Sequence, residues 1–161
     1  MTEDDLRHLR RCAELAAEAL EAGDAPFGSV LVAGDGTVLH EDRNRESTGV
    51  PTHHPELMLA LWAAEHLDAD ARSDATVYTS GEHCPMCAGA HAYAGVGRIV
   101  FAVSGEQYAA WRASFGLADR GIVGAFSAQQ IAPRVRVEGP AEAMADVMHD
   151  LHRRHAERLS R

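Results

Sequence analysis

The sequence lacks any apolar run that approaches the roughly 18 residues needed by a membrane-spanning helix. Its first residues, MTEDDLRHLRR, also lack the apolar stretch of a secretory signal. We therefore expect a soluble, cytoplasmic protein with no membrane partner. With 161 residues, 46% of them hydrophobic, the chain is long enough to bury roughly two-thirds of its unfolded surface, so we expect one ordered domain.

Basic residues are in the minority. Lys and Arg number 15 against 24 Asp and Glu, which gives a formal net charge of −9. Proteins that bind nucleic acids usually carry a basic face, because contacts with phosphates supply much of their affinity. A nucleic-acid partner is therefore not expected, although a local basic patch could exist within an acidic average.

Cysteine is scarce, since the chain contains three. Such low usage suits a reducing compartment and implies no disulfide framework. Cys12 falls in a helical stretch and is most simply a small core residue. Cys84 and Cys87 form a Cys-x-x-Cys pair, which is typical of metal sites and of redox dithiols.

The hydrophobic pattern indicates an α/β chain, and the fold we predict is a three-layer α/β/α sandwich around a mixed five-stranded sheet. Apolar residues at three- and four-residue steps indicate amphipathic helices at both ends of the chain. The turn Gly34-Asp35-Gly36 between two apolar runs predicts a β-hairpin. The run from Leu57 to Trp62 is apolar nearly all round, which indicates a buried helix. The expected helices span residues 4–22, 55–67, 85–94, 106–114 and 141–158, the expected strands span 27–33, 37–42, 75–80, 98–103 and 134–137, and residues 115–130 are ambiguous.

Two separated motifs together predict a divided zinc site. They are Thr52-His53-His54-Pro55-Glu56 and Gly81-Glu82-His83-Cys84-Pro85-Met86-Cys87. His54, Cys84 and Cys87 would supply three ligands to one Zn²⁺ and leave a fourth position open for water, as in a catalytic site. In each motif a proline follows the first ligand, which favours a helix start there. A helix N-terminus in turn favours the thiolate that binds metal.

Two other functions stay open at this point. A thiol oxidoreductase could use Cys84 and Cys87, but it would leave the histidine motif without a role. A structural zinc module, which is not an enzyme, would need a fourth ligand such as His53 or His83.

Two further features have simple structural interpretations. His149, His152 and His155 recur at a helical spacing that can attract metal, but they most simply form a solvated helix face. Glu82, beside the cysteine motif, could hydrogen-bond backbone near the metal.

The combination of His-x-Glu, a separation of 30 residues from His54 to Cys84, and Cys-x-x-Cys resembles the signature of zinc deaminases. Residues 24–104 resemble the cytidine deaminase superfamily, in the branch of free-base and tRNA deaminases that includes guanine deaminase. His83 replaces the family's usual proline, a departure that concerns the substrate more than the metal. Outside the zinc residues the resemblance rests on Pro26-Phe27-Gly28-Ser29-Val30, Asn44-Arg45, Pro51-Thr52 and the run CPMCAGA.

The resemblance implies roles for particular residues. Glu56 would carry protons from water to the ring and to the departing ammonia. Asn44 could read an amide-like ring edge, since its side chain both donates and accepts hydrogen bonds, or it could be a turn asparagine. Phe27 could stack on a flat heterocycle or pack in the core. His53 and His83, which flank two ligands, are further candidates for substrate contact.

The resemblance also implies a substrate class and an assembly. We expect residues 1–161 to form a single zinc-dependent deaminase domain with the cytidine deaminase-like fold. Its expected substrate is a free nucleobase, with guanine the leading candidate. The alternatives are an analogue such as isoguanine, cytosine, azacytosine or an aminotriazine, and adenosine in tRNA. Because relatives in this branch are commonly dimers, we expect a homodimer.

Overall fold

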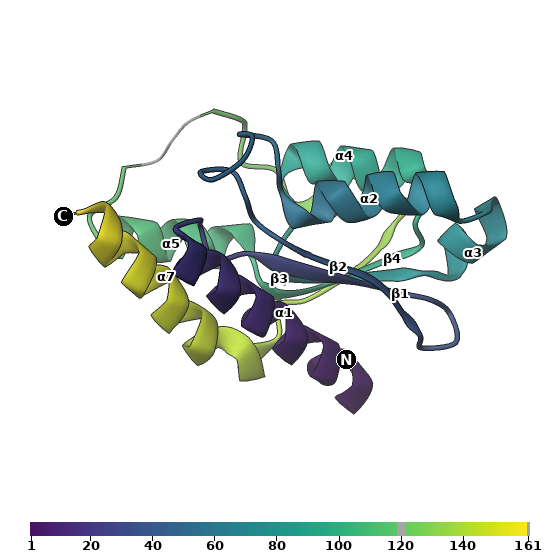
Figure 1. Ribbon diagram of the computed structural model, residues 1–161, viewed down its shortest axis with the longest axis horizontal. Helices are drawn as coiled ribbons and strands as arrows, with labels where there is room; N and C mark the ends of the chain where they lie inside the picture. Colours follow the sequence, from purple (N-terminus) through teal and green to yellow (C-terminus); the bar gives the residue numbers. More distant parts are fainter. Residues whose placement is uncertain (119–121, 161) are drawn as a thin grey trace.

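A five-stranded sheet lies at the centre of the computed structural model, which describes residues 1–118 and 122–160 (Figure 1). The strands span Gly28–Val32 (β1), Val38–Arg43 (β2), Thr76–Gly81 (β3), Arg98–Val103 (β4) and Arg136–Glu138 (β5). Their order in the sheet is β2-β1-β3-β4-β5. β1 is antiparallel to β2 and β3, whereas β3, β4 and β5 are parallel. The sheet is therefore mixed.

Helices cover both faces of this sheet. They span Glu3–Ala22 (α1), Pro55–His66 (α2), Ala69–Asp74 (α3), Pro85–Ala94 (α4), Gly105–Ser114 (α5), Ala128–Ile131 (α6) and Ala145–Leu159 (α7), with a 3-10 turn (η1) at Glu142–Met144. α2 and α4 lie side by side on one face, and α1 and α7 lie on the other, with α5 next to α7 (Figure 1). The predicted three-layer sandwich around a mixed five-stranded sheet is confirmed.

Explicit start and stop signals explain why the element boundaries agree with the sequence pattern. α1 begins at a capping box in which Thr2 and Asp5 satisfy each other's backbone N–H groups, and it ends at Gly23, whose φ of 97° favours glycine. α1 packs closely on β1, because a Cβ at Gly28 would lie 2.4 Å from the Cβ of Leu15. The sequence pattern does not predict α3, although Asp68 caps its start by accepting a hydrogen bond from the N–H of Ala71, and it does not separate η1 from α7. The first three residues of α6 fall in the ambiguous segment 115–130, and residues 119–121 of that segment lie outside the described part.

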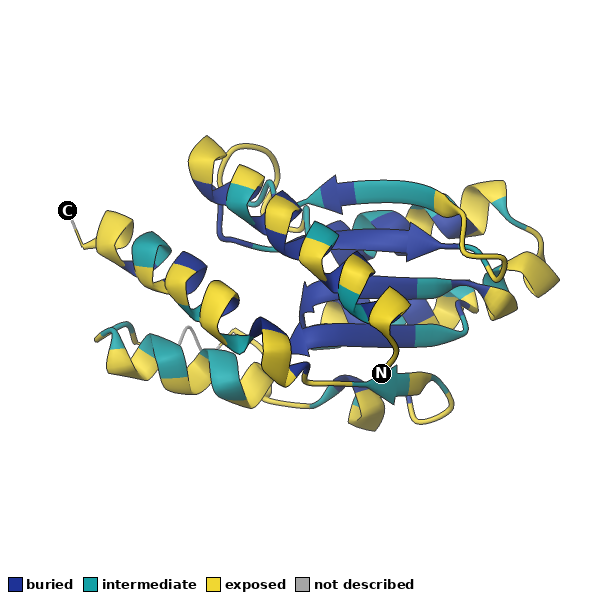
Figure 2. Ribbon diagram, turned by 90° about the horizontal axis from the view of Figure 1, so that it is seen from below, coloured by how far each residue is buried: buried dark blue, intermediate teal, exposed yellow. Residues whose placement is uncertain are grey.

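The core occupies both spaces between the layers. Buried strands lie behind helices whose outward sides are exposed (Figure 2). All five residues of β1 are buried, as expected for a strand covered on both faces. The larger core side chains are Leu9, Leu20, Val30, Val100 and Met148 on the α1 side, and Leu31, Leu59, Val77 and Val96 on the α2 side.

α2 differs from the sequence prediction. Its apolar pattern predicts a helix buried on all sides, but Leu61 is 50% exposed and Met58 and Trp62 are only partly buried. Leu59 and Ala63, which face the sheet, are fully buried. The prediction is wrong because nothing among the described residues covers the outer side of α2, which therefore presents apolar side chains at the surface.

A buried ion pair joins α1 to the start of the parallel strands. Asp5 accepts hydrogen bonds from Arg98 (2.8 and 3.1 Å) and from the Tyr78 hydroxyl (2.8 Å), and Arg98 also donates to Glu138 (3.0 Å). Burial raises the pKa of Asp5, but hydrogen bonds from Arg98, the Thr2 amide and Tyr78 outweigh it and hold that pKa well below its usual range. The folded state therefore favours the ionised carboxyl.

We expect Arg98→Met to lower the free energy of unfolding by about 3 kcal/mol at pH 7, because it leaves a buried carboxylate without its cation. Since the pKa of Asp5 in the folded state lies below its unfolded value of about 3.9, the pair stabilises the fold above that pH and loses its effect as the pH falls from about 5. Urea unfolding should show a smaller difference between wild type and Arg98→Met at pH 3 than at pH 7. Arg7→Met, at an exposed position on α1, is the control and should change stability by less than about 0.5 kcal/mol. An equal loss at both pH values for Arg98→Met would contradict this assignment.

No described helix combines the length and the apolar character needed to cross a membrane.

Candidate metal centre and active site

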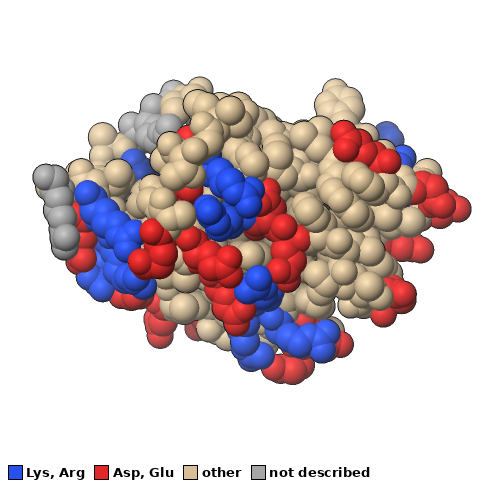
Figure 3. Space-filling model, in the orientation of Figure 1, with Lys and Arg blue, Asp and Glu red and all other residues tan. Residues whose placement is uncertain are grey.

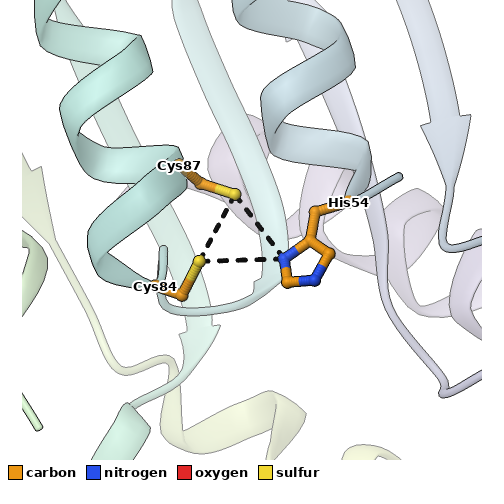
Figure 4. A group of neighbouring side chains, drawn as sticks. All are labelled: His54, Cys84 and Cys87. Carbon is orange, nitrogen blue, oxygen red and sulfur yellow. Dashed lines mark hydrogen bonds between the residues drawn. The ribbon is translucent and has the colours of Figure 1, made fainter. Parts of the chain in front are cut away.

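His54, Cys84 and Cys87 converge at the starts of two neighbouring helices (Figure 4). His54 Nδ1 lies 3.7 Å from Cys84 Sγ and 3.6 Å from Cys87 Sγ, and the two sulfur atoms are 3.5 Å apart. Cys87 is buried and the other two residues are partly buried. The fold thus brings the two halves of the predicted zinc motif to one point.

The helix starts explain how these side chains are held. His54 and Cys84 are the N-caps of α2 and α4, with Pro55 and Pro85 as the first helical residues, as the spacing predicts. Neither cap side chain accepts a hydrogen bond from its helix, so both remain available to a metal. Cys87 lies in the first turn of α4. Because α2 and α4 are neighbours on one face of the sheet, their first turns present the three ligand atoms to each other.

The three atoms fit a zinc ion. Tetrahedral Zn²⁺ with Zn–S bonds of about 2.3 Å and a Zn–N bond of about 2.0 Å would hold two sulfurs about 3.8 Å apart and a sulfur and a nitrogen about 3.5 Å apart. The observed separations are 3.5 to 3.7 Å. Hydrogen bonding from Cys87, supported by His54, also lowers the pKa of Cys84 to about 4 against the effect of burial. A thiolate therefore forms readily at Cys84, whereas the hydrogen bond to Cys84 and burial raise the pKa of Cys87.

No fourth ligand joins these three within the described residues. The His53 ring instead contacts Asp42 (3.1 Å) and Arg45 (2.9 Å). His83 is buried and packs against His91, with ring centroids 5.3 Å apart. The geometry therefore argues against a structural zinc module closed by His53 or His83, and the histidine beside both sulfurs argues against a simple redox dithiol.

Glu56, in the first turn of α2, is only 5% exposed. Burial raises the pKa of Glu56 to about 7, although the nearby His54 acts in the opposite direction. Its Oε1 accepts a hydrogen bond from Thr79 Oγ1 (2.9 Å), which in turn accepts one from Ser29 Oγ (2.9 Å). A carboxyl group whose pKa lies near 7 can both accept and release a proton at neutral pH.

The sequence analysis did not single out Thr79 and Ser29. They are opposite each other in the β1–β3 pair, and both are fully buried. Their hydrogen bonds fix the carboxyl group of Glu56. The signal that could have found Ser29 is a single hydroxyl side chain in the otherwise apolar β1, whereas Thr79 shares β3 with Thr76 and Ser80 and does not stand out.

Asn44 follows β2 and is buried. Its backbone N–H donates to the carbonyl of Phe27 (2.9 Å), and its Oδ1 accepts from the N–H of Glu46 (2.7 Å). The oxygen is thus used in a turn, as the turn-asparagine interpretation predicts. The side-chain nitrogen donates to none of the described residues, so it remains available as a donor.

Phe27 lies at the same end of the sheet. Its ring covers Gly81, where an added Cβ would lie 2.8 Å from the ring. The other sides of the ring pack against Tyr108 and His152, with centroids 5.4 and 5.1 Å away. The residue is only partly buried, so its position allows both a core contact and a contact with a ligand.

A model of the MafB19-like deaminases matches residues 3–154. The chain belongs to the MafB19-like deaminase family. The resemblance to cytidine deaminase-like enzymes that the motifs indicate is thereby confirmed.

Two curated relatives match part of the chain. It is 34% identical over 110 residues to a probable cytosine deaminase of Schizosaccharomyces pombe, covering 66% of this chain and 65% of that protein. It is 42% identical over 84 residues to a guanine deaminase of Bacillus subtilis, covering 51% and 53%. The matched region therefore spans only about half to two-thirds of these relatives' length.

The fold similarity extends further along the chain. The structure of a guanine deaminase from Nitrosomonas europaea superposes with a TM-score of 0.70 at 20% identity, over 93% of this chain and 83% of that one. At this identity the similarity establishes the fold.

In this family member, Glu82 connects two helices near the metal site. It accepts hydrogen bonds from the backbone N–H groups of Gly105 and Ala128, 2.9 Å in each case. These are the first residues of α5 and α6, where a carboxylate is favoured by the helix dipole.

The histidines of α7 depart from the sequence interpretation. A solvated helix face predicts three exposed rings, but His152 is only 4% exposed and packs against Phe27, Tyr108 and Trp111. Burial lowers the pKa of His152 to about 3, so the ring is neutral at pH 7. For His152 the interpretation was wrong, because α5 and the start of β1 pack over that side of α7.

Proposed function

We propose that this chain is a zinc-dependent hydrolytic deaminase of a free nucleobase or base analogue, with guanine the leading candidate. The observation that carries the proposal is the His54, Cys84 and Cys87 triangle, which has no fourth ligand among the described residues and lies beside the buried Glu56. Membership of a deaminase family supports the same reaction class.

Each residue would have a defined task. Zinc, when bound, would supply Lewis acidity that lowers the pKa of a water molecule. Hydroxide, the stronger nucleophile, would then be available near pH 7. Glu56 would accept one proton from the attacking water and deliver it to the ring nitrogen, and would then carry the second proton of that water to the amino group, which leaves as ammonia. The side-chain nitrogen of Asn44 would donate to the ring edge, and Phe27 would present a flat apolar surface to the base.

The two remaining candidates for substrate contact would act less directly. His53 is held by Asp42 and Arg45, so it would orient the segment that leads to the first ligand. His83 directly precedes Cys84 and is almost completely buried. It would therefore affect the substrate site through packing and not through direct contact.

The choice among substrates rests on the relatives and on charge. The relatives include guanine and cytosine deaminases, which supports a free base, and also a tRNA-specific adenosine deaminase. The net charge of −9 disfavours a phosphate-rich substrate. Isoguanine, azacytosine and an aminotriazine share the amino-bearing ring carbon, so analogues of this kind are the main alternative.

A side-by-side assay of ammonia release tests this proposal. The panel contains guanine, isoguanine, cytosine, azacytosine, an aminotriazine, guanosine and a tRNA anticodon stem-loop. We expect turnover of a free base, with guanine the fastest. Inosine formed in the RNA while every free base and analogue stays intact would replace this proposal with a tRNA adenosine deaminase, and no turnover of any compound would remove it.

We further propose that the chain forms a homodimer through the outer sides of α2 and α4. α4 contains no charged residue, and Tyr93 on it is 96% exposed. Leu61 on α2 is 50% exposed, and Figure 3 shows a largely uncharged area where these helices lie. A second copy would cover this apolar surface.

Sedimentation should therefore show a dimer for the wild type at micromolar concentration. Leu61→Asp and Tyr93→Asp should each shift it to a monomer, because each would bury a charge in the interface. Val147→Asp, at an exposed position on α7, is the matched control and should remain dimeric. A monomeric wild type would refute the proposed assembly.

The cytoplasm is the compartment we propose, because two of the three cysteines are assigned to the metal and none is disulfide-bonded. Recovery of the protein from an extracellular or membrane fraction would contradict this.

A further inference from the structure

We propose that Glu46 is a positioning residue that holds the outer nitrogen of His54 and so fixes the imidazole for metal binding through Nδ1. The inference rests on the proposed zinc site and adds a residue that the sequence motifs do not contain. Glu46 lies in the segment between β2 and α2, eight residues before His54.

The two nitrogens of His54 face different partners. Nδ1 points toward both sulfurs, at 3.7 and 3.6 Å, whereas Nε2 lies 3.6 Å from Oε2 of Glu46. A neutral imidazole that binds metal through Nδ1 must carry its proton on Nε2. That proton therefore lies on the side of the ring that faces the carboxylate, which favours this tautomer and this ring orientation.

The side chains of Asn44 and Asp24 hold the backbone around Glu46 by accepting hydrogen bonds from it. Its N–H donates to Oδ1 of Asn44 (2.7 Å). The next two N–H groups, of Ser47 and Thr48, both donate to Oδ1 of Asp24 at 2.9 Å, and the Thr48 hydroxyl donates to Oδ2 at 2.7 Å. Asp24 is fully buried. The segment is thus ordered before a metal binds, so little conformational entropy is lost when Glu46 meets the ring.

The charge of Glu46 also suits the site. Its side chain is 19% exposed and that of His54 is 28% exposed, so water screens their interaction only in part. At 3.6 Å the carboxylate lies close enough to Nε2 to polarise the neutral imidazole, which makes the ring a better electron donor to a cation. Glu46 would therefore strengthen zinc binding without touching the metal.

The test is the zinc dissociation constant, measured by competition with a chelator at pH 7. Glu46→Ala should weaken zinc binding roughly tenfold, at the low end of the 10- to 100-fold range for such partners because the separation is long. Glu46→Gln keeps an oxygen acceptor but loses the charge. Its zinc dissociation constant should lie between those of the wild type and Glu46→Ala. Glu65→Ala, at an exposed position in the last turn of α2, is the control and should bind zinc like the wild type.

A second measurement separates positioning from folding. The unfolding temperature of the metal-free protein should be the same in wild type and Glu46→Ala, because the backbone bonds of residue 46 remain. If Glu46→Ala lowered the stability of the metal-free protein by as much free energy as it lost in zinc binding, the role of Glu46 would be merely structural. That result would overturn the inference. Equal zinc affinity in all variants would overturn it while leaving the proposed function intact, whereas a wild type that binds no zinc would remove both.

Discussion

Replacement of Glu56 by alanine is expected to lower turnover at least a hundredfold while leaving zinc bound. Glu56 is buried beside the three ligands, is hydrogen-bonded by Thr79 and does not belong to the ligand triangle. A proton carrier in this position typically contributes roughly 100- to 10,000-fold to the rate. Turnover of the best free base, measured with the zinc content of the same sample, gives both quantities.

Two variants make the Glu56 experiment specific. Glu56→Gln keeps the shape of the side chain and its acceptor for Thr79 but cannot take up a proton, so it should lose activity as Glu56→Ala does. Glu65→Ala, on the same helix but exposed, should keep both activity and zinc. Near-normal turnover in Glu56→Gln would remove this residue from the mechanism, and loss of zinc in Glu56→Ala would make it a ligand instead.

Replacement of Cys84 and Cys87 together by serine is expected to reduce zinc from one ion per chain to nearly none, and to abolish activity. The two sulfurs are two of the three ligand atoms, and a neutral hydroxyl is a far weaker zinc ligand than a thiolate. Elemental analysis of the purified protein measures the zinc directly. Cys12→Ala is the control, because Cys12 is buried in α1 within the core and outside the metal site.

The cysteine experiment also separates the rival functions. A thiol oxidoreductase would lose activity in the double variant but would contain no stoichiometric zinc as wild type. A structural zinc module would lose both zinc and stability in the double variant. Such a module has no turnover, so Glu56→Ala would show no loss of activity. Full retention of zinc by the double variant would end the metal assignment altogether.

The fold class and the ligand set could be predicted from the sequence because their signals are local. Proline after His54 and after Cys84 marks two helix starts, and both residues are indeed N-caps. Alternating helix and strand patterns predicted a mixed five-stranded sheet between helix layers, which the structure contains. Histidine nitrogen and cysteine sulfur are atoms that zinc binds readily in proteins. A histidine and two cysteines at this spacing therefore predict a zinc site.

Features that depend on which side of an element is covered could not be predicted in this way. The apolar pattern of α2 does not say that its outer side stays open, and the histidines of α7 do not say that His152 faces α5 and the start of β1. Periodicity gives the direction of side chains around an axis, but burial depends on elements that are distant in sequence.

The residue types, the helix starts and the acidic charge were thus determined by the sequence itself, because each depends on neighbouring residues or on composition. Only the tertiary structure decided that Thr79 bonds Glu56 and that Glu46 lies 3.6 Å from the outer nitrogen of His54. These contacts join segments from β3, α2 and the connection after β2. Strand pairing and helix packing set their distances, and both are long-range interactions that no local pattern of residues encodes.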